Sequence, residues 1–372
     1  CLYLFLPMVS NSMQNKILQF RGDVMKIAVL HDYFDKHGGG EKVAITLAKA
    51  FDADIITGFV DEKNTYPELK ELNVIKIAKR SRIPVLPLMK KFERLELNYD
   101  FFIFSGTACI AANHNKPNLW YCHTPARYLY DLKQWYDANT NVFGRIAMEQ
   151  LRKIVLPKDQ MYAKRFDKII ANSENVRRRI NKYYKIKNHI PVIYPPTDVK
   201  KFRYKINEDF YLSTARLDKL KRVDLIVRAF RKMPDKSLVV ISSGPEKGKI
   251  EKLANGCENI EVKGWVSDNE YIDLLSRCTA TIYIPVNEDS GISPVESMAA
   301  GKPCIVSNEG GVVETILHNR TGLHIKVNEE NLIRAVKWLT PERAKNMRNA
   351  CIVRSRKFSE DNFIKEMRRM VK

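Results

Sequence analysis

Short apolar runs alternate with amphipathic stretches along the first half of the chain, beginning at Met25. Residues 26–30 form one such run and predict a buried strand, and the glycines at 38–40 predict a turn before a helical stretch, EKVAITLAKAF. Further strands are predicted at residues 54–57, 101–104, 119–122 and 168–171. Continuous apolar strands separated by helices indicate a parallel sheet that helices cover on both faces.

A second series of the same kind follows the segment PVIYPP at 191–196, where prolines interrupt regular structure. A helix is predicted over 222–232, and strands are predicted at residues 210–214, 237–242, 261–263, 280–285 and 303–307. We therefore expect two doubly wound α/β domains. Their expected bounds are 25–195 and 208–358, followed by a final helix over 359–372 for which packing back on the first domain is one arrangement. Ligands of such sheets bind beyond the carboxyl ends of the strands, so two facing domains would share one cleft.

The first 24 residues do not fit this series. Their apolar run lacks a basic region before it and is too short to span a bilayer. Because Met25 stands immediately before the first predicted strand, we expect residues 1–24 to be an upstream extension. No other segment of the chain has the pattern of a transmembrane helix.

The charge of the chain is strongly basic, with 63 Lys and Arg against 43 Asp and Glu and a formal net charge of +20. Such an excess attracts nucleic acid, anionic lipid or a polyphosphate substrate, and net charge alone does not choose among them. The seven cysteines form no CxxC pair, and their odd number argues against a complete disulfide framework. These features favour a reducing, cytoplasmic compartment, with a peripheral place at the inner face of the cell membrane as one option. The histidines lack paired-ligand spacing, so we expect no metal site.

The segment NEDSGISPVESMAAGKP at 287–303 has the most informative spacing, because seven residues separate Glu288 from Glu296. Pro294 suits the first turn of a helix, where an acidic residue is also favoured. The backbone amides of the preceding loop would suit phosphate oxygens. The amides concerned are those of Ser290, Gly291 and Ile292. Spacing alone leaves open that both glutamates are solvated loop and cap residues.

This segment closely resembles the E-x7-E signature of the retaining glycosyltransferases of family 4, which have the GT-B fold of two facing Rossmann-like domains. The resemblance continues through AAGKPCIVSNEGGVVETILHNRTGL. Upstream, STARLDKLKRVDLIVRAF, SSGPE and KGWVSDNEYIDLL resemble further segments of the same family in the same order. The resemblance therefore covers the whole second domain, and five ordered matches identify a family far more specifically than one match does.

The resemblance implies roles for four residues of the second domain. Arg216 and Lys221 match the pair that neutralises the donor diphosphate, where two cations stabilise charge on the departing nucleotide. Glu296 matches the acceptor of the ribose hydroxyls, and Glu288 matches the glutamate near the transferred sugar. A solvated pair of cations at a helix start is the alternative for Arg216 and Lys221.

Three positions depart from the family pattern. Arg222 stands where a glycine often follows the lysine of the motif, and Asp289 and Ser290 replace bulkier residues. The contacts of the donor sugar are therefore left open.

The first domain resembles the family in two segments. KIAVLHDYFDKHGGGEKV matches the opening strand and glycine loop, where Gly39 and Gly40 would let the backbone approach the donor, although a simple turn is the alternative. LWYCHTPARYLYD places His123 just past a strand end, and in the family a histidine here lies beside donor sugar and acceptor. A lone histidine is otherwise more often structural. The run HTPARYLYD resembles a mannosyltransferase-like subgroup.

Residues 79–94, KRSRIPVLPLMKKFER, place six Lys or Arg around an apolar centre. Cations beside exposed apolar side chains suit an anionic membrane surface or a lipid diphosphate, whereas a solvated helix face is the common alternative. Nucleic acid is a weaker expectation because no recognised nucleic-acid module accompanies the charge.

We therefore expect a retaining glycosyltransferase that moves a hexose, with mannose from GDP-mannose as the favoured donor, onto a glycan or lipid-linked acceptor. It would need no cofactor beyond the nucleoside-diphosphate sugar that is its substrate. A catalytically silent sugar-nucleotide-binding subunit is one alternative. A nicotinamide-dependent dehydrogenase is another, which the absence of G-x-G-x-x-G after residues 26–30 disfavours.

Overall fold

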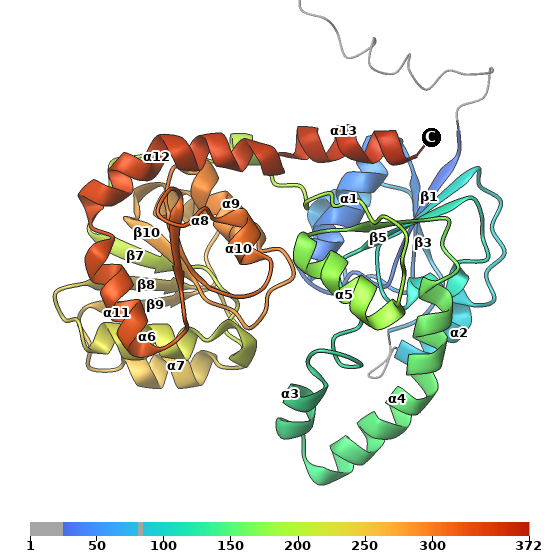
Figure 1. Cartoon of the computed structure of the whole chain (residues 1–372), viewed down its shortest axis with the longest axis horizontal. Coiled ribbons are helices and arrows are strands. Elements are labelled where there is room, and N and C mark those ends of the chain that lie inside the picture. The colour runs from blue at the N-terminus through green and yellow to red at the C-terminus, as the bar shows by residue number, and fades with distance from the viewer. Residues whose placement is uncertain (1–24, 81–84, 372) are drawn as a thin grey trace, which may run out of the picture.

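Two parallel sheets form the core of the molecule, and the computed structural model describes them within residues 25–80 and 85–371 (Figure 1). The first sheet has six strands in the order β3-β2-β1-β4-β5-β6. Its strands are β1 (Ile27–His31), β2 (Asp54–Thr57), β3 (Val74–Lys76), β4 (Phe101–Phe104), β5 (Asn118–Cys122) and β6 (Lys168–Ala171). Its helices are α1 (Gly39–Phe51), α2 (Val85–Phe92), α3 (Lys133–Ala138), α4 (Val142–Ala163) and α5 (Glu174–Tyr184), with short 3-10 helices η3 (Pro67–Glu71) and η4 (Cys109–Ala112).

The second sheet repeats this arrangement, with six parallel strands in the order β12-β11-β10-β7-β8-β9. Its strands are β7 (Phe210–Ser213), β8 (Ser237–Ile241), β9 (Ile260–Gly264), β10 (Ala280–Tyr283), β11 (Cys304–Ser307) and β12 (Gly322–Ile325). The helices are α6 (Val223–Arg231), α7 (Lys247–Ala254), α8 (Asp268–Arg277), α9 (Ile292–Ala299), α10 (Val312–Thr315), α11 (Glu329–Trp338), α12 (Pro341–Ser355) and α13 (Glu360–Met370), and the short 3-10 helices are η5 (Val199–Lys201), η6 (Lys219–Lys221) and η7 (Arg356–Phe358).

The chain enters each sheet at a central strand, winds to one edge and then returns to fill the other, which is the doubly wound order. Every residue of β1, β4 and β7 is buried, because helices cover both faces of the sheet. This burial is why these strands are continuous apolar runs. The predicted fold class, two facing doubly wound α/β domains, is confirmed.

Two edge strands, β3 and β12, escape the sequence pattern. β3 pairs only with β2, and Ile75 and Lys76 in it are exposed. β12 pairs only with β11 and begins at Gly322. The side chains of β3 have few neighbours to bury them, so this strand need not be a continuous apolar run. Most of β12 is buried, but Gly322 and His324 interrupt its apolar pattern.

The last helix, α13, crosses from the second domain and packs on the first (Figure 1). Phe363 and Met367 are buried in the cluster that also holds residues of α1 and β1. The ring of Phe363 meets the ring of Tyr121 edge-on at 5.6 Å, and Arg368 donates a hydrogen bond of 3.1 Å to the carbonyl of Ala50. The end of the chain therefore completes the core of the first domain.

Six free cysteines lie in the described residues, and five of them are buried, where a thiol packs as a small hydrophobe. Over the same two ranges, no helix combines the length and the apolar character needed to cross a membrane. The expectation that residues 1–24 are an upstream extension lies outside the described residues.

Candidate active site

A cavity of about 870 Å³ lies between the two domains, at the carboxyl ends of strands from both sheets. The loops after β1, β5 and β6 line it from the first domain, and the loops after β7, β8 and β10 line it from the second. A Cβ atom on Gly39 would lie 2.9 Å from Cδ1 of Ile292, so the glycine loop of one domain closely approaches the start of α9 in the other. The expected shared cleft is therefore present.

Most of the predicted site residues meet in this cavity. Those that line it are Gly39, Gly40, His123, Arg216, Lys221, Glu288, Ser290, Gly291 and Ile292. Gly291 has φ of +90° and directly precedes α9, a backbone conformation that L side chains rarely adopt. The glycine thus lets the chain turn sharply from the cavity loop into the helix.

Lys221 and Glu288 form an ion pair at the cavity wall. The ammonium of Lys221 donates to Oε2 of Glu288 at 2.6 Å and to the hydroxyl of Tyr283 at 3.0 Å. Burial would raise the pKa of Glu288, but the charge and hydrogen bond of Lys221, the charge of Arg127 and the hydrogen bond of Tyr283 together lower that pKa. Burial would likewise lower the pKa of Lys221, yet Tyr283 and Glu288 raise it. Both groups are therefore charged at neutral pH.

Arg216 is exposed at the cavity, and its side chain has no hydrogen-bond or ion-pair partner in the part of the chain that the structure describes. Its guanidinium is free to bind an anion. Arg222, which follows Lys221 and departs from the family pattern, has φ of +55°. Its guanidinium pairs with Glu309 at 2.7 Å. A glycine adopts this left-handed backbone without strain, so the conformation accounts for the glycine often found here. The charge of Arg222 has a partner of its own.

Glu296 is not among the residues that line the cavity in the described structure. It lies one helical turn into α9, where its Oε2 accepts a hydrogen bond of 2.5 Å from the hydroxyl of Tyr271 on α8. Burial raises the pKa of this carboxyl. Sequence reasoning missed Tyr271, because nothing in the E-x7-E spacing indicates a partner from another helix.

His123 follows β5 and faces the glycine loop. Its Nε2 lies 2.8 Å from the hydroxyl of Ser105, and a Cβ atom on Gly40 would lie 3.8 Å from the same nitrogen. Burial, followed by the nearby charge of His31, lowers the pKa of His123 to about 3. The imidazole is therefore neutral at physiological pH and acts through hydrogen bonds.

Asn172 is a further cavity residue that sequence reasoning missed. It follows β6, is only 4% exposed and lines the cavity. Its Oδ1 has no hydrogen-bond partner in the described residues. A buried amide oxygen without a partner is costly unless a ligand or water satisfies it. The segment IIANSEN contains this residue, but its neighbours give no sign that the amide points into a cleft.

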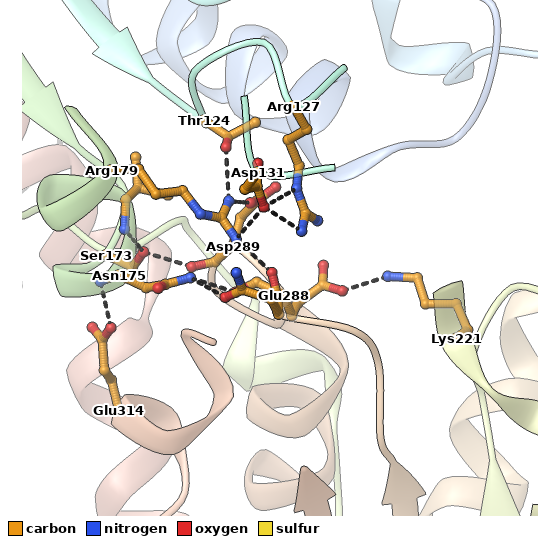
Figure 2. A network of polar contacts seen from close by, with 12 residues as sticks. Thr124, Arg127, Asp131, Ser173, Asn175, Arg179, Lys221, Glu288, Asp289 and Glu314 are labelled. Carbon is orange, nitrogen blue, oxygen red and sulfur yellow. Dashed lines mark hydrogen bonds and ion pairs between the residues drawn. The ribbon is translucent and has the colours of Figure 1, made fainter. Parts of the chain in front are cut away.

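Helix α5 joins the first domain to the loop that carries Glu288 (Figure 2). The guanidinium of Arg179 contacts the carboxylate of Asp289 and donates to the carbonyl of Asn287 at 2.6 Å. On its own domain it donates to the hydroxyl of Thr124 at 2.9 Å and lies 3.4 Å from Asp131. Arg179 therefore ties the motif loop to the first domain.

The N-terminal end of α5 donates further hydrogen bonds to the second domain (Figure 2). Glu314 on α10 accepts from the backbone amides of Glu174 and Asn175 at 2.7 and 2.6 Å. Asn175 also donates from its side chain to the carbonyl of Glu288 at 2.9 Å. A carboxylate at a helix N-terminus is favoured by the helix dipole. Sequence reasoning missed this cap because the partner comes from the other domain.

The expectation that the apolar centre of residues 79–94 faces a membrane is wrong for two of its residues. Leu88 and Met89 on α2 are 3% exposed and belong to the core of the first domain, so they are not available to enter a lipid surface. The helix is amphipathic because its apolar side packs inward. Of its cations, those exposed are Lys79, Arg80, Lys90, Lys91 and Arg94. Arg82 and Ile83 lie outside the described residues.

Two family models match the chain, one over each domain. The model described as Glycosyltransferase Family 4 matches residues 37–201, and the model described as Glycosyl transferases group 1 matches residues 196–358. Both matches include residues of the cavity described above.

Curated relatives match over most of the chain. The alpha-1,3/1,6-mannosyltransferase of Kluyveromyces lactis is 23% identical over 392 residues, which covers 86% of this chain and 75% of the relative. The alpha-1,3/1,6-mannosyltransferase of Mus musculus is 24% identical over 349 residues, which covers 77% of this chain and 80% of the relative.

Solved structures share the fold. Sucrose-phosphate synthase from Thermosynechococcus elongatus superposes with a TM-score of 0.74 at 17% identity, covering 93% of this chain and 98% of that chain. Anabaena HepE in complex with UDP and glucose gives a TM-score of 0.73 at 18% identity, covering 93% and 99%.

Proposed function

Because this chain belongs to the family 4 glycosyltransferases, we propose that its cleft binds GDP-mannose and transfers the mannose, with retention of configuration, to a glycan or lipid-linked acceptor. The names of the two relatives support mannose as the sugar. The observation that carries the proposal is the arrangement of Lys221, Glu288 and the unpartnered Arg216 around one interdomain cavity.

The cations supply the chemistry that the departing nucleotide needs. Arg216 and Lys221 would bind the diphosphate and stabilise the charge that it gains as the bond to the sugar breaks. The amides at Ser290 and Gly291, just before α9, add donors for phosphate oxygens. These groups would do this without a metal ion.

Retention favours attack from the face that the diphosphate leaves. The carboxylate of Glu288 is held by Lys221 at 2.6 Å, which makes it a poor nucleophile for a covalent intermediate. In the step proposed, the acceptor hydroxyl oxygen bonds to the anomeric carbon while the bond from that carbon to the phosphate oxygen breaks. The departing phosphate oxygen takes the hydroxyl proton. Neutral His123 would hydrogen-bond a sugar hydroxyl and carry no charge.

A donor screen tests the proposal. The purified chain is incubated with GDP-mannose, GDP-fucose, UDP-glucose and UDP-N-acetylglucosamine, and thermal shift, release of nucleoside diphosphate and the anomer of the product are measured. We expect GDP-mannose to give stabilisation, turnover and an α-linked product, all unaffected by a chelator. A β-linked product would overturn retention, and a preference for another donor would overturn mannose.

The same screen separates an enzyme from a catalytically silent subunit. A silent subunit would be stabilised by one donor without releasing the diphosphate, alone or with acceptor. The variant Lys221→Met provides the matched control, because it should lose release and most of the stabilisation together.

A further inference from the structure

The helices α3 and α4 form an arm that projects from the first domain (Figure 1). We call this arm, residues 133–163, the α3–α4 arm. The inner side of α4 is satisfied within the protein. Arg152 on that side is 4% exposed and bonds to Asp137 at 2.6 Å and to the carbonyl of Tyr128 at 2.9 Å. Val155 and Tyr162 belong to the core of the first domain.

The outer side of α4 has an apolar face that nothing in the described structure covers. Its large side chains have high exposed fractions. These are Val142 with 57%, Phe143 with 83%, Ile146 with 57%, Ile154 with 52% and Met161 with 37%. Successive members of this set lie one, three, eight and seven residues apart, and at 3.6 residues per turn these spacings place all five on one side of the helix. Single exposed apolar residues are ordinary, but five large ones on the same side of one helix mark an interaction surface.

The charge around this face has one sign. Arg145 and Lys153 lie on α4, and Lys164 and Arg165 follow it, all exposed and without a side-chain partner in the described residues. The acids of the arm are engaged elsewhere. Glu149 pairs with Lys133 at 3.2 Å and Asp137 with Arg152, while Asp159 is buried and accepts from Tyr130 at 2.6 Å.

We propose that the outer face of α4 docks on an anionic lipid bilayer. An amphipathic helix with large apolar side chains and unpaired cations lies in the interface of such a bilayer, with its apolar face among the acyl chains. A second copy of this chain is a weaker fit, because the same unpaired cations on both copies would repel. This surface replaces the segment at 79–94 as the main membrane contact.

The position of the arm relates this surface to the cleft. Asn139, just after α3, accepts a hydrogen bond of 2.9 Å from Lys219, which lies in η6 beside the diphosphate-binding candidate Lys221. A bilayer held by the arm therefore lies near the cleft. If the acceptor is lipid-linked, as proposed above, docking would bring it to the site.

Vesicle sedimentation tests the docking without any donor or acceptor. The full chain is mixed with vesicles of phosphatidylcholine, with or without phosphatidylglycerol. We expect binding to the anionic vesicles alone, weakened by salt. The variant Phe143→Ser/Ile146→Ser/Ile154→Ser should bind at least about tenfold more weakly, because it removes most of the apolar face. Arg145→Gln/Lys153→Gln should weaken the preference for anionic lipid, because it removes two of the four unpaired cations.

A matched control removes equally exposed apolar residues from elsewhere. Ile206 is 84% exposed and Val353 is 63% exposed, both outside the first domain. Ile206→Ser/Val353→Ser should bind vesicles as the wild type does. All variants should hydrolyse donor at the wild-type rate, which shows that they fold. Transfer to a water-soluble acceptor tests the proposed function separately, so either idea can fail alone.

Four results would overturn the docking. The wild type could remain in the supernatant with anionic vesicles at low salt, or the triple variant could bind as tightly as the wild type. Lys79→Gln/Lys90→Gln/Lys91→Gln/Arg94→Gln could release the protein while the α4 variants do not. Light scattering could also show a wild-type dimer that the triple variant loses, which would make the outer face of α4 an interface between copies.

Discussion

Replacing Arg179 with methionine should destabilise the protein and loosen the loop that carries Glu288. The side chain of Arg179 is 6% exposed, and its guanidinium contacts Asp289, Asp131, Thr124 and the carbonyl of Asn287. Methionine keeps much of the length and apolar contact but removes every donor. Removing one partner of a buried ion pair leaves the other charge uncompensated and costs about 3–5 kcal/mol.

Urea unfolding measures this cost. Because the chain has two domains, each transition is followed separately and its slope is compared with the wild type. Arg178→Met is the matched control, since Arg178 is the exposed neighbour on the same helix and should change stability by about 0.5 kcal/mol at most. The double variant Arg179→Met/Asp289→Leu should recover part of the loss, because it removes the stranded carboxylate. A loss below about 1 kcal/mol in Arg179→Met would refute the reasoning.

Three further predictions concern the cavity. Arg216→Ala should weaken nucleoside-diphosphate binding by about 2 kcal/mol in a calorimetric titration, because it removes charge-assisted bonds, and unchanged affinity would remove Arg216 from the site. Asn172→Ala should lower kcat/KM by an amount equivalent to about 1 kcal/mol of transition-state stabilisation. The melting temperature should not fall, because the amide oxygen has no hydrogen-bond partner among the described residues. A large drop in melting temperature would show that the residue has a structural role. The pKa of His123 is lowered to about 3, below its unfolded value, so its neutral form stabilises the fold above about pH 6.5 and that contribution is lost as the pH falls toward 3. Between pH 6 and 4, unfolding free energy should therefore fall less steeply in His123→Phe than in the wild type, and parallel profiles would contradict the buried neutral imidazole.

The fold followed from the sequence wherever burial on both faces makes a strand continuously apolar, as in β1, β4 and β7. The edge strand β3 did not, because Ile75 in it is 40% exposed and the segment has no such run. Those residues of the site that lie together in one sequence motif could be predicted. Lys221 and the loop at 288–292 belong to ordered motifs.

The rest of the site depends on contacts that no local pattern contains. Arg179 and Asp289 are 110 residues apart and meet only because the domains face each other. The run IPVLPLM illustrates the opposite error. Its composition suits a membrane surface and a protein core equally well, and only tertiary packing places Leu88 and Met89 in the core. The apolar residues on the outer side of α4 have the same ambiguity in the sequence, and the structure leaves them exposed.

The cap that Glu314 places on α5 makes the integrity of a helix in one domain depend on the presence of the other. Any motion that separates the domains must break the hydrogen bonds from the amides of Glu174 and Asn175 to this carboxylate and replace them with hydrogen bonds to water. Exchanging a protein partner for water costs about 1.5–3 kcal/mol where the partner is charged. A free-energy cost of this size disfavours separation of the domains but still permits it. Strengthening the cap would retain product longer and weakening it would let donor escape before reaction, so the turnover rate should peak at an intermediate cap strength.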